Sequence, residues 1–140
     1  MIVLDTNIIS EIMRPQPDTD VVAWLNQCAI EQLFITSTTL AEIYYGLAIL
    51  PDGQRKQNLQ QRFDYFITQG FSERILVFDA KAAVIYAEIM GQSKRIGQPM
   101  SFPDGQIAAI TQTHHFSLAT RNIKDFKHCS VPLINPFKDH

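Results

Sequence analysis

Short apolar runs recur along the chain and alternate with stretches in which apolar residues are three and four positions apart. The runs comprise residues 2–4, 33–35, 75–78, 117–120 and 131–134. Consecutive apolar positions indicate strands that are buried on both faces, and this alternation is typical of a parallel sheet covered by helices. It predicts an α/β fold with a mostly parallel central sheet of four to five short strands, flanked by helices. The last run is expected at an edge, because Pro132 cannot donate to a ladder.

Helix starts and ends are marked by capping residues and by proline or glycine. Asp18 or Asp20 can cap one helix and Asp79 another, while Gly97 is placed to end the second. Helices are therefore expected over residues 8–13, 21–28, 40–50, 54–68, 80–97 and 102–111.

Length and composition exclude several classes of protein. The 140 residues suit a single domain over residues 1–140, and 46% hydrophobic residues with a net charge of −2 exclude a disordered chain. No run of roughly 18 apolar residues occurs, so no membrane association is expected, and the start does not resemble a signal peptide. Cys28 and Cys129 stand far apart and lack metal-ligand spacing, which favours a reducing, cytoplasmic location.

Charge is unevenly distributed along the chain. Residues 1–80 hold five basic and ten acidic residues, a net −5, whereas residues 81–140 hold seven and four, a net +3. A chain that binds nucleic acid without selectivity is usually more basic overall. Contact with a polyanion through the second half, or ordinary solvated surface charge, are both compatible with this pattern.

Acidic and amide side chains lie where the predicted strands end. Asp5 follows the first strand, Glu42 follows the second, Asp104 opens the helix before the fourth, and Asn122 and Asp125 follow the fourth. Because parallel strands end at one edge of the sheet, these side chains are expected to gather there.

Each acid, taken alone, also has a purely structural explanation. Asp5 can cap the next helix, and Thr39-x-x-Glu42 and Ser101-x-x-Asp104 have the spacing of capping boxes. Capping does not require the acids to share one edge, whereas a site for a hard cation does. Grouped carboxylates suit Mg²⁺ or Mn²⁺, which can activate water for attack at phosphorus.

Other chemistry has weaker support. The phosphate-binding, dinucleotide-binding and serine-hydrolase glycine motifs are absent. His114 and His115 are adjacent, so they point apart on a helix and are expected at the surface. Trp24 and the phenylalanines fall on apolar stripes and are expected in the core.

Four segments, in this order, resemble the four motifs of PIN-domain ribonucleases, and more closely those of the VapC/FitB-like toxins of bacterial toxin–antitoxin pairs. They are IVLDTNIISE (2–11), TLAEIYYG (39–46), PDGQIAA (103–109) and LATRNIKDF (118–126). The resemblance implies a Mg²⁺- or Mn²⁺-dependent endoribonuclease with a PIN-like fold, blocked by a small antitoxin protein. It also implies a homodimer and contact with DNA only through the antitoxin.

The same resemblance assigns roles by position. Asp5 and Asp104 match the metal-ligating aspartates, and Glu42 matches the third catalytic acid. Many family members carry an acid at the fourth position, where this chain has Asn122, so a tightly held second metal ion is in doubt. The resemblance also implies supporting residues. The hydroxyls of Thr6 and Thr120 would support the acids, and Arg121 would contact a phosphate.

Two further hypotheses stay open on the sequence. The missing fourth acid allows a binding module for nucleic acid and antitoxin in which catalysis is vestigial. The same acids also allow a metal-dependent phosphatase or DNA nuclease.

Overall fold

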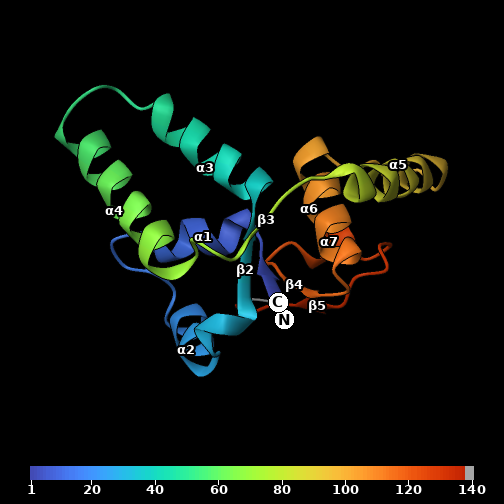
Figure 1. Ribbon diagram of the computed structural model, residues 1–140, viewed down its shortest axis with the longest axis horizontal. Coiled ribbons are helices and arrows are strands. Elements are labelled where there is room, and N and C mark those ends of the chain that lie inside the picture. Colours follow the sequence, from blue (N-terminus) through green and yellow to red (C-terminus); the bar gives the residue numbers. More distant parts are fainter. Residues whose placement is uncertain (138–140) are drawn as a thin grey trace.

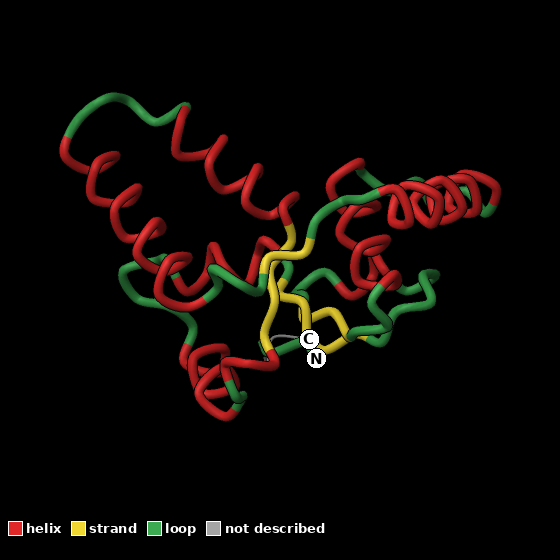
Figure 2. Tube along the Cα trace, viewed as in Figure 1, coloured by secondary structure: helices red, strands yellow, loops and turns green. Residues whose placement is uncertain are grey.

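The computed structural model describes residues 1–137, so residues 138–140 of the expected domain lie outside the described residues. At its centre is a five-stranded sheet in the order β3-β2-β1-β4-β5, with every neighbouring pair parallel (Figure 1, Figure 2). The predicted α/β architecture is confirmed, and the last strand lies at an edge. The strands are β1 (Ile2–Leu4), β2 (Leu33–Thr36), β3 (Ile75–Leu76), β4 (Ser117–Ala119) and β5 (Leu133–Ile134).

Helices flank the sheet on both sides. In Figure 1, α1 to α4 lie to the left of the strands and α5 to α7 to the right. No helix within the described residues is long and apolar enough to cross a membrane. The helices are α1 (Thr6–Ile12), α2 (Thr19–Gln27), α3 (Ser37–Ala48), α4 (Gln54–Gly70), α5 (Ala80–Arg95), α6 (Phe102–Thr113) and α7 (Ile123–Phe126), and a short 3-10 helix spans Ile30–Gln32.

Alternating strand side chains supply a separate hydrophobic core to each face of the sheet. Leu4, Ile35 and Ala119 are buried in the core beneath α1 to α4. Val3 precedes Leu4 on β1, and Leu118 precedes Ala119 on β4. Both are buried in the core beneath α5 and α6. Because successive side chains of a strand point to opposite faces, strands of only three or four residues hold both layers.

Two helices begin earlier than their apolar spacing predicts, because their caps lie at the ends of strands. Asp5 follows β1 directly and its Oδ1 accepts a hydrogen bond from the backbone N–H of Thr6, which starts α1 at residue 6. Thr36, the last residue of β2, accepts from the N–H of Thr39 and starts α3 at residue 37. Both helices thus leave the sheet without an intervening loop, which fixes their first turns at its edge.

The expected core residues lie in the two cores or pack against them, with one exception. Phe102 is the first residue of α6 and is 70% exposed, so the expectation that every phenylalanine lies in the core is wrong for this one. Trp24 is partly buried against the first core, and His114 and His115 are exposed, as predicted. The helix-start position of Phe102 places its ring beyond the stripe that α6 buries.

Helices α5 and α6 approach closely at Gly105. A Cβ at this position would lie 2.5 Å from Met90 Sδ and 3.0 Å from the Tyr86 ring. Glycine therefore permits a separation of the two helices that a larger residue would prevent. Since Gly105 follows Asp104 directly, this contact also fixes the place of that acid.

Candidate active site

Asp5 lies at the centre of the sheet edge and is almost completely buried, with 4% of its surface exposed. Its Oδ1 caps α1 through the Thr6 N–H at 2.8 Å, and its Oδ2 accepts from the Thr120 hydroxyl at 2.8 Å. Thr120 follows the neighbouring strand β4. Asp5 is therefore a helix cap, as the structural explanation held, and is also anchored across the sheet to a residue 115 positions later.

Glu42 comes from α3 and points to the first turn of α1. Its Oε1 accepts a hydrogen bond of 2.6 Å from the hydroxyl of Thr6, which also lies 3.0 Å from the hydroxyl of Thr39. The cap of α3 is Thr36 rather than Thr39, so the capping-box explanation of Glu42 is wrong. The carboxylate is instead one turn further into the helix and is held by a side chain from a different element.

Asp104 lies in the first turn of α6 and is half-buried. Ser101 Oγ accepts from the Asp104 N–H at 3.3 Å, and the Asp104 carboxyl also hydrogen-bonds the Ser101 side chain. Ser101 therefore caps α6 at the predicted spacing, which is one of the two bonds of a capping box. This cap accounts for the local conformation of Asp104, and the exposed part of the residue lies at the pocket described below.

The loop after β4 brings the remaining predicted residues to the same edge. The Thr120 hydroxyl, which donates to Asp5, accepts from the backbone N–H of Asn122 at 3.0 Å. Asn122 precedes α7, and its side chain does not cap that helix. The backbone N–H of Arg121 donates to Asn7 Oδ1 at 3.4 Å, and its guanidinium lies 4.3 Å from the Phe137 ring centroid.

These residues share one open pocket. Its volume is about 520 Å³, and Asp5, Glu42 and Asp104 reach it from three separate elements. Thr6, Arg121 and Asn122 line it too, whereas Thr120 is buried behind Asp5. Asp125 does not line this pocket and belongs to two adjacent hollows, together with Lys124 and Lys127.

Burial and mutual repulsion make two of the acids hard to ionise. Burial raises the pKa of Asp5 from 3.8 to about 6, against the lowering effect of the hydrogen bonds from Thr120 and Thr6. The charges of Asp104 and Glu42 raise it further. Burial likewise raises the pKa of Asp104, the Ser101 hydrogen bond lowers it, and the charges of Asp125 and Glu42 raise it.

The pocket fits a hard divalent cation in its chemistry. The residues that line it carry four carboxylates (Asp5, Glu11, Glu42, Asp104), the Asn122 amide and the Thr6 hydroxyl, and oxygen donors are what Mg²⁺ and Mn²⁺ prefer. A cation would also relieve the repulsion that raises the pKa of Asp5 and Asp104. Among residues 1–137, however, no three His, Cys, Asp or Glu side chains stand together as a group that could hold a metal ion. The acids thus share a pocket without forming a finished ligand group.

Four residues that line this pocket were not predicted from the sequence as site residues. They are Asn7, Ser10, Glu11 and Arg14, all from α1 or the turn that ends it. Their spacing of three, four and seven positions places them along one side of the helix. This polar stripe, opposite the buried Ile8 and Ile9, is the signal that could have identified them.

Comparison with known proteins shows the family of this chain. The family model described as PIN domain matches residues 2–131. The chain is 41% identical to "Toxin FitB" of Neisseria gonorrhoeae, over 99% of this chain and 100% of that protein. It is 39% identical to "VapC ribonuclease Y4jK" of Sinorhizobium fredii, over 99% of each.

A solved structure shows the same fold. The "Structure of FitAB bound to IR36 DNA fragment" contains a chain that matches with a TM-score of 0.92 and 40% identity, over 100% of this chain and 99% of that one. Sequence, fold and the convergence of acids at the sheet edge all agree. The chain therefore belongs to the PIN domain family, in the group of FitB- and VapC-type toxins.

Proposed function

We propose that this protein is a divalent-metal-dependent endoribonuclease, the toxin of a toxin–antitoxin pair. The observation that carries the proposal is the convergence of Asp5, Glu42 and Asp104, from three elements, on one open pocket. Burial, with a smaller contribution from neighbouring carboxylates, raises the pKa of Asp5 and of Asp104. The name of a relative 39% identical over its whole length, a VapC ribonuclease, supports RNA as the substrate.

Asp5, Asp104 and Glu42 would hold a Mg²⁺ or Mn²⁺ ion. When bound, such an ion supplies a Lewis acid that activates water and stabilises negative charge at phosphorus. The Thr120 hydroxyl keeps Asp5 oriented through its bond to Oδ2, and the Thr6 hydroxyl does the same for Glu42. The protein therefore fixes the carboxylates of Asp5 and Glu42 before substrate binds, which lowers the cost of reorganisation.

Asn122 and Arg121 complete the pocket on the side of β4. The Asn122 side chain is not used as a helix cap, so its amide remains available to a water molecule or to substrate. It is neutral and adds no attraction for a second cation. Arg121 is fixed through its backbone and against the Phe137 ring, and its guanidinium suits a phosphate of the RNA backbone.

The proposed function includes partners. A toxin needs an inhibitor, and a chain 40% identical to this one occurs in a FitAB assembly bound to a DNA fragment. We infer a small antitoxin protein that covers the acidic pocket and makes the contact with DNA. A homodimer of the toxin is part of the same inference, and a cytoplasmic location follows from RNA as substrate.

The test is cleavage of total tRNA by antitoxin-free protein with Mg²⁺, with Mn²⁺ or with EDTA. We expect discrete fragments that require metal, and a loss of at least about 100-fold in rate for Asp104→Asn. Asp79→Asn serves as the matched control, because Asp79 is also an aspartate beside a helix start, but at the exposed start of α5. Cleavage that persists in Asp104→Asn protein of equal purity contradicts the assigned site.

The neutral Asn122 supports a second candidate, a module that binds antitoxin and nucleic acid without cutting. Under that function, metal neither binds the protein nor changes its stability, and RNA remains intact in every condition. A further variant in the cleavage assay, Asp125→Asn, tests whether the Asp125 carboxylate assists Asn122 in RNA cleavage. Because Asp125 lies outside the pocket, we expect its rate to fall by less than about tenfold.

A further inference from the structure

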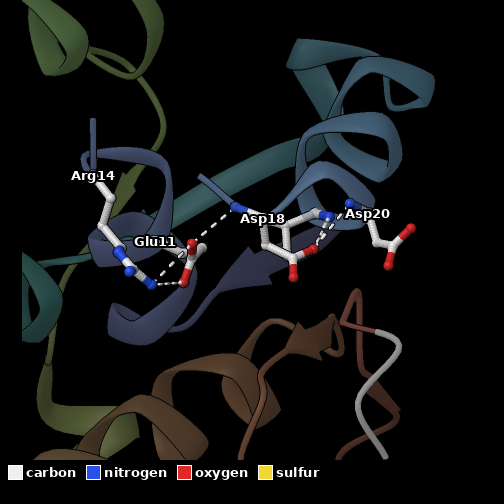
Figure 3. Close-up of polar contacts among 5 residues, drawn as sticks. Glu11, Arg14, Asp18 and Asp20 are labelled. Carbon is white, nitrogen blue, oxygen red and sulfur yellow. Dashed lines mark hydrogen bonds and ion pairs between the residues drawn. The ribbon is translucent and has the colours of Figure 1, made fainter. Parts of the chain in front are cut away.

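Glu11 and Arg14 line the acidic pocket, yet neither belongs to the group of three acids. Figure 3 shows their side chains meeting at the end of α1, beside the start of α2. Arg14 Nη1 lies 3.3 Å from Glu11 Oε1 and 3.5 Å from Oε2. The pair therefore forms one wall of the proposed active site.

Glu11 is a buried carboxylate with two partners. Its side chain is 7% exposed, and Oε2 accepts a hydrogen bond of 2.9 Å from the backbone N–H of Asp18, the cap of α2. This bond joins the end of α1 to the start of α2. The intervening loop contains Pro15 and Pro17, whose fixed φ angles restrict it further. Glu11 thus sits on a rigid frame.

Arg14 keeps most of its hydrogen-bonding capacity. Its side chain is 64% exposed, and Glu11 is its only side-chain partner within the described residues. A guanidinium carries five N–H donors, and the bond to Glu11 uses those of one terminal nitrogen. The other donors can form the paired hydrogen bonds that suit a phosphate. Glu11 is buried whereas the Arg14 side chain is mostly exposed, so the ion pair accounts for one terminal nitrogen and leaves the rest of the guanidinium at the surface of the pocket.

The two arginines of the pocket are placed at opposite ends of α1. Arg121 bonds Asn7 in the first turn of the helix, whereas Arg14 follows its last turn. Arg14 stands seven positions after Asn7, which corresponds to roughly 10 Å along a helix axis. Asp5 and Glu42 meet the same helix at Thr6, so the acids and both arginines share its polar side.

We propose that Arg14, positioned by Glu11, binds a backbone phosphate of the RNA, separate from the phosphate bound by Arg121. The inference rests on the proposed ribonuclease function and adds the path of the strand, which crosses the acids between two arginine contacts. Arg14 touches substrate, whereas Glu11 is a positioning residue that acts through it.

The test measures binding of a labelled single-stranded RNA by fluorescence anisotropy, in EDTA and in the non-cleaving Asp104→Asn background, from 50 to 300 mM KCl. Arg14→Ala is expected to weaken binding about tenfold and to reduce the slope of log K against log salt by about 0.7. Arg14→Lys should retain the slope. Arg95→Ala is the matched control, since Arg95 Nη2 also bonds a side chain three residues earlier, Gln92, but on α5 outside the pocket.

Glu11→Gln separates positioning from a structural role. If Glu11 acts through Arg14, the effect of Arg14→Ala shrinks at least about threefold in the Glu11→Gln background, a coupling that simple loss of stability does not produce. Equal effects of Arg14→Ala in both backgrounds overturn the role of Glu11. If Arg14→Ala and its parent bind RNA with the same affinity and the same salt slope, the phosphate contact is overturned. The proposed function still holds in that case if wild-type protein cleaves RNA with metal and Asp104→Asn does not. If wild-type protein leaves the RNA intact, only the ribonuclease function is rejected. If the Asp104→Asn parent does not bind RNA, both the ribonuclease function and the Arg14 contact are rejected.

Discussion

Replacing Asp5 by asparagine is expected to stabilise the metal-free protein at neutral pH. Folding raises the pKa of this carboxyl from 3.8 to about 6, mainly through burial, so the folded state holds its proton more tightly than the unfolded state. Well below pH 3.8 both states are protonated and folding carries no penalty. The penalty grows between about pH 3.8 and pH 6, and it levels off at about 3 kcal/mol once both states are ionised.

Asparagine remains neutral at every pH, so the variant avoids this penalty. Between pH 4.5 and pH 7.5 the penalty in the wild type increases by about 2 kcal/mol. The difference in unfolding free energy between Asp5→Asn and wild type should increase by the same amount in favour of the variant. Hydrogen-bond losses at Thr6 or Thr120 are largely common to both pH values and cancel in this comparison.

The assay is urea unfolding in EDTA at the two pH values, followed by circular dichroism. Asp79→Asn is the control, because Asp79 caps α5 at an exposed position where its charge favours the helix start. That variant is expected to lose a few tenths of a kcal/mol at pH 7.5 rather than to gain stability. A difference for Asp5→Asn that does not change with pH would falsify the electrostatic explanation.

Three further outcomes follow from the packing and the hydrogen bonds. Gly105→Ala should lower the unfolding free energy by about 1–3 kcal/mol in urea because of its short contacts in α6, whereas Gly46→Ala, with open space around its Cβ in α3, should raise it by about 0.5–1 kcal/mol. Thr6→Val should slow RNA cleavage at least about tenfold by releasing Glu42, and Thr6→Ser should retain most of the rate; equal rates for both variants contradict the positioning role. Mg²⁺ at about 100 times its Kd should stabilise the wild type by about 2.7 kcal/mol in thermal unfolding, and no such gain is expected for Asp5→Asn.

The fold could be predicted closely from the sequence because the three central strands, β1, β2 and β4, are largely buried and read as apolar runs. Apolar runs of three or four residues cannot form helices, so their positions were evident, and Pro132 marked the edge. The order of the strands and the boundaries of the helices depend on tertiary contacts. β3 keeps only two of four expected residues in the ladder, and α1 and α3 start early because Asp5 and Thr36 cap them from the strand ends.

The site was predictable in its acids and less so in their supports. Asp5, Glu42 and Asp104 lie at strand ends or helix starts, where parallel topology gathers them. The sequence alone could not decide whether Glu42 caps its own helix, because Thr36 and Thr39 both have suitable side chains; the answer depends on where β2 ends. Nor could it show that Glu11 is buried, since that depends on how the loop returns to Asp18.

The hydrogen bond between Asp5 and Thr120 determines when, during synthesis of the chain, the pocket of the proposed toxin can assemble. Asp5 leaves the ribosome long before its partner Thr120, which is made 115 residues later, directly after the strand β4. Asp104 and Arg121 are also made about 100 residues or more after Asp5. A nascent chain that has yet to expose β4 cannot assemble the pocket, so the proposed toxin stays inactive until β4 and the loop after it have been made.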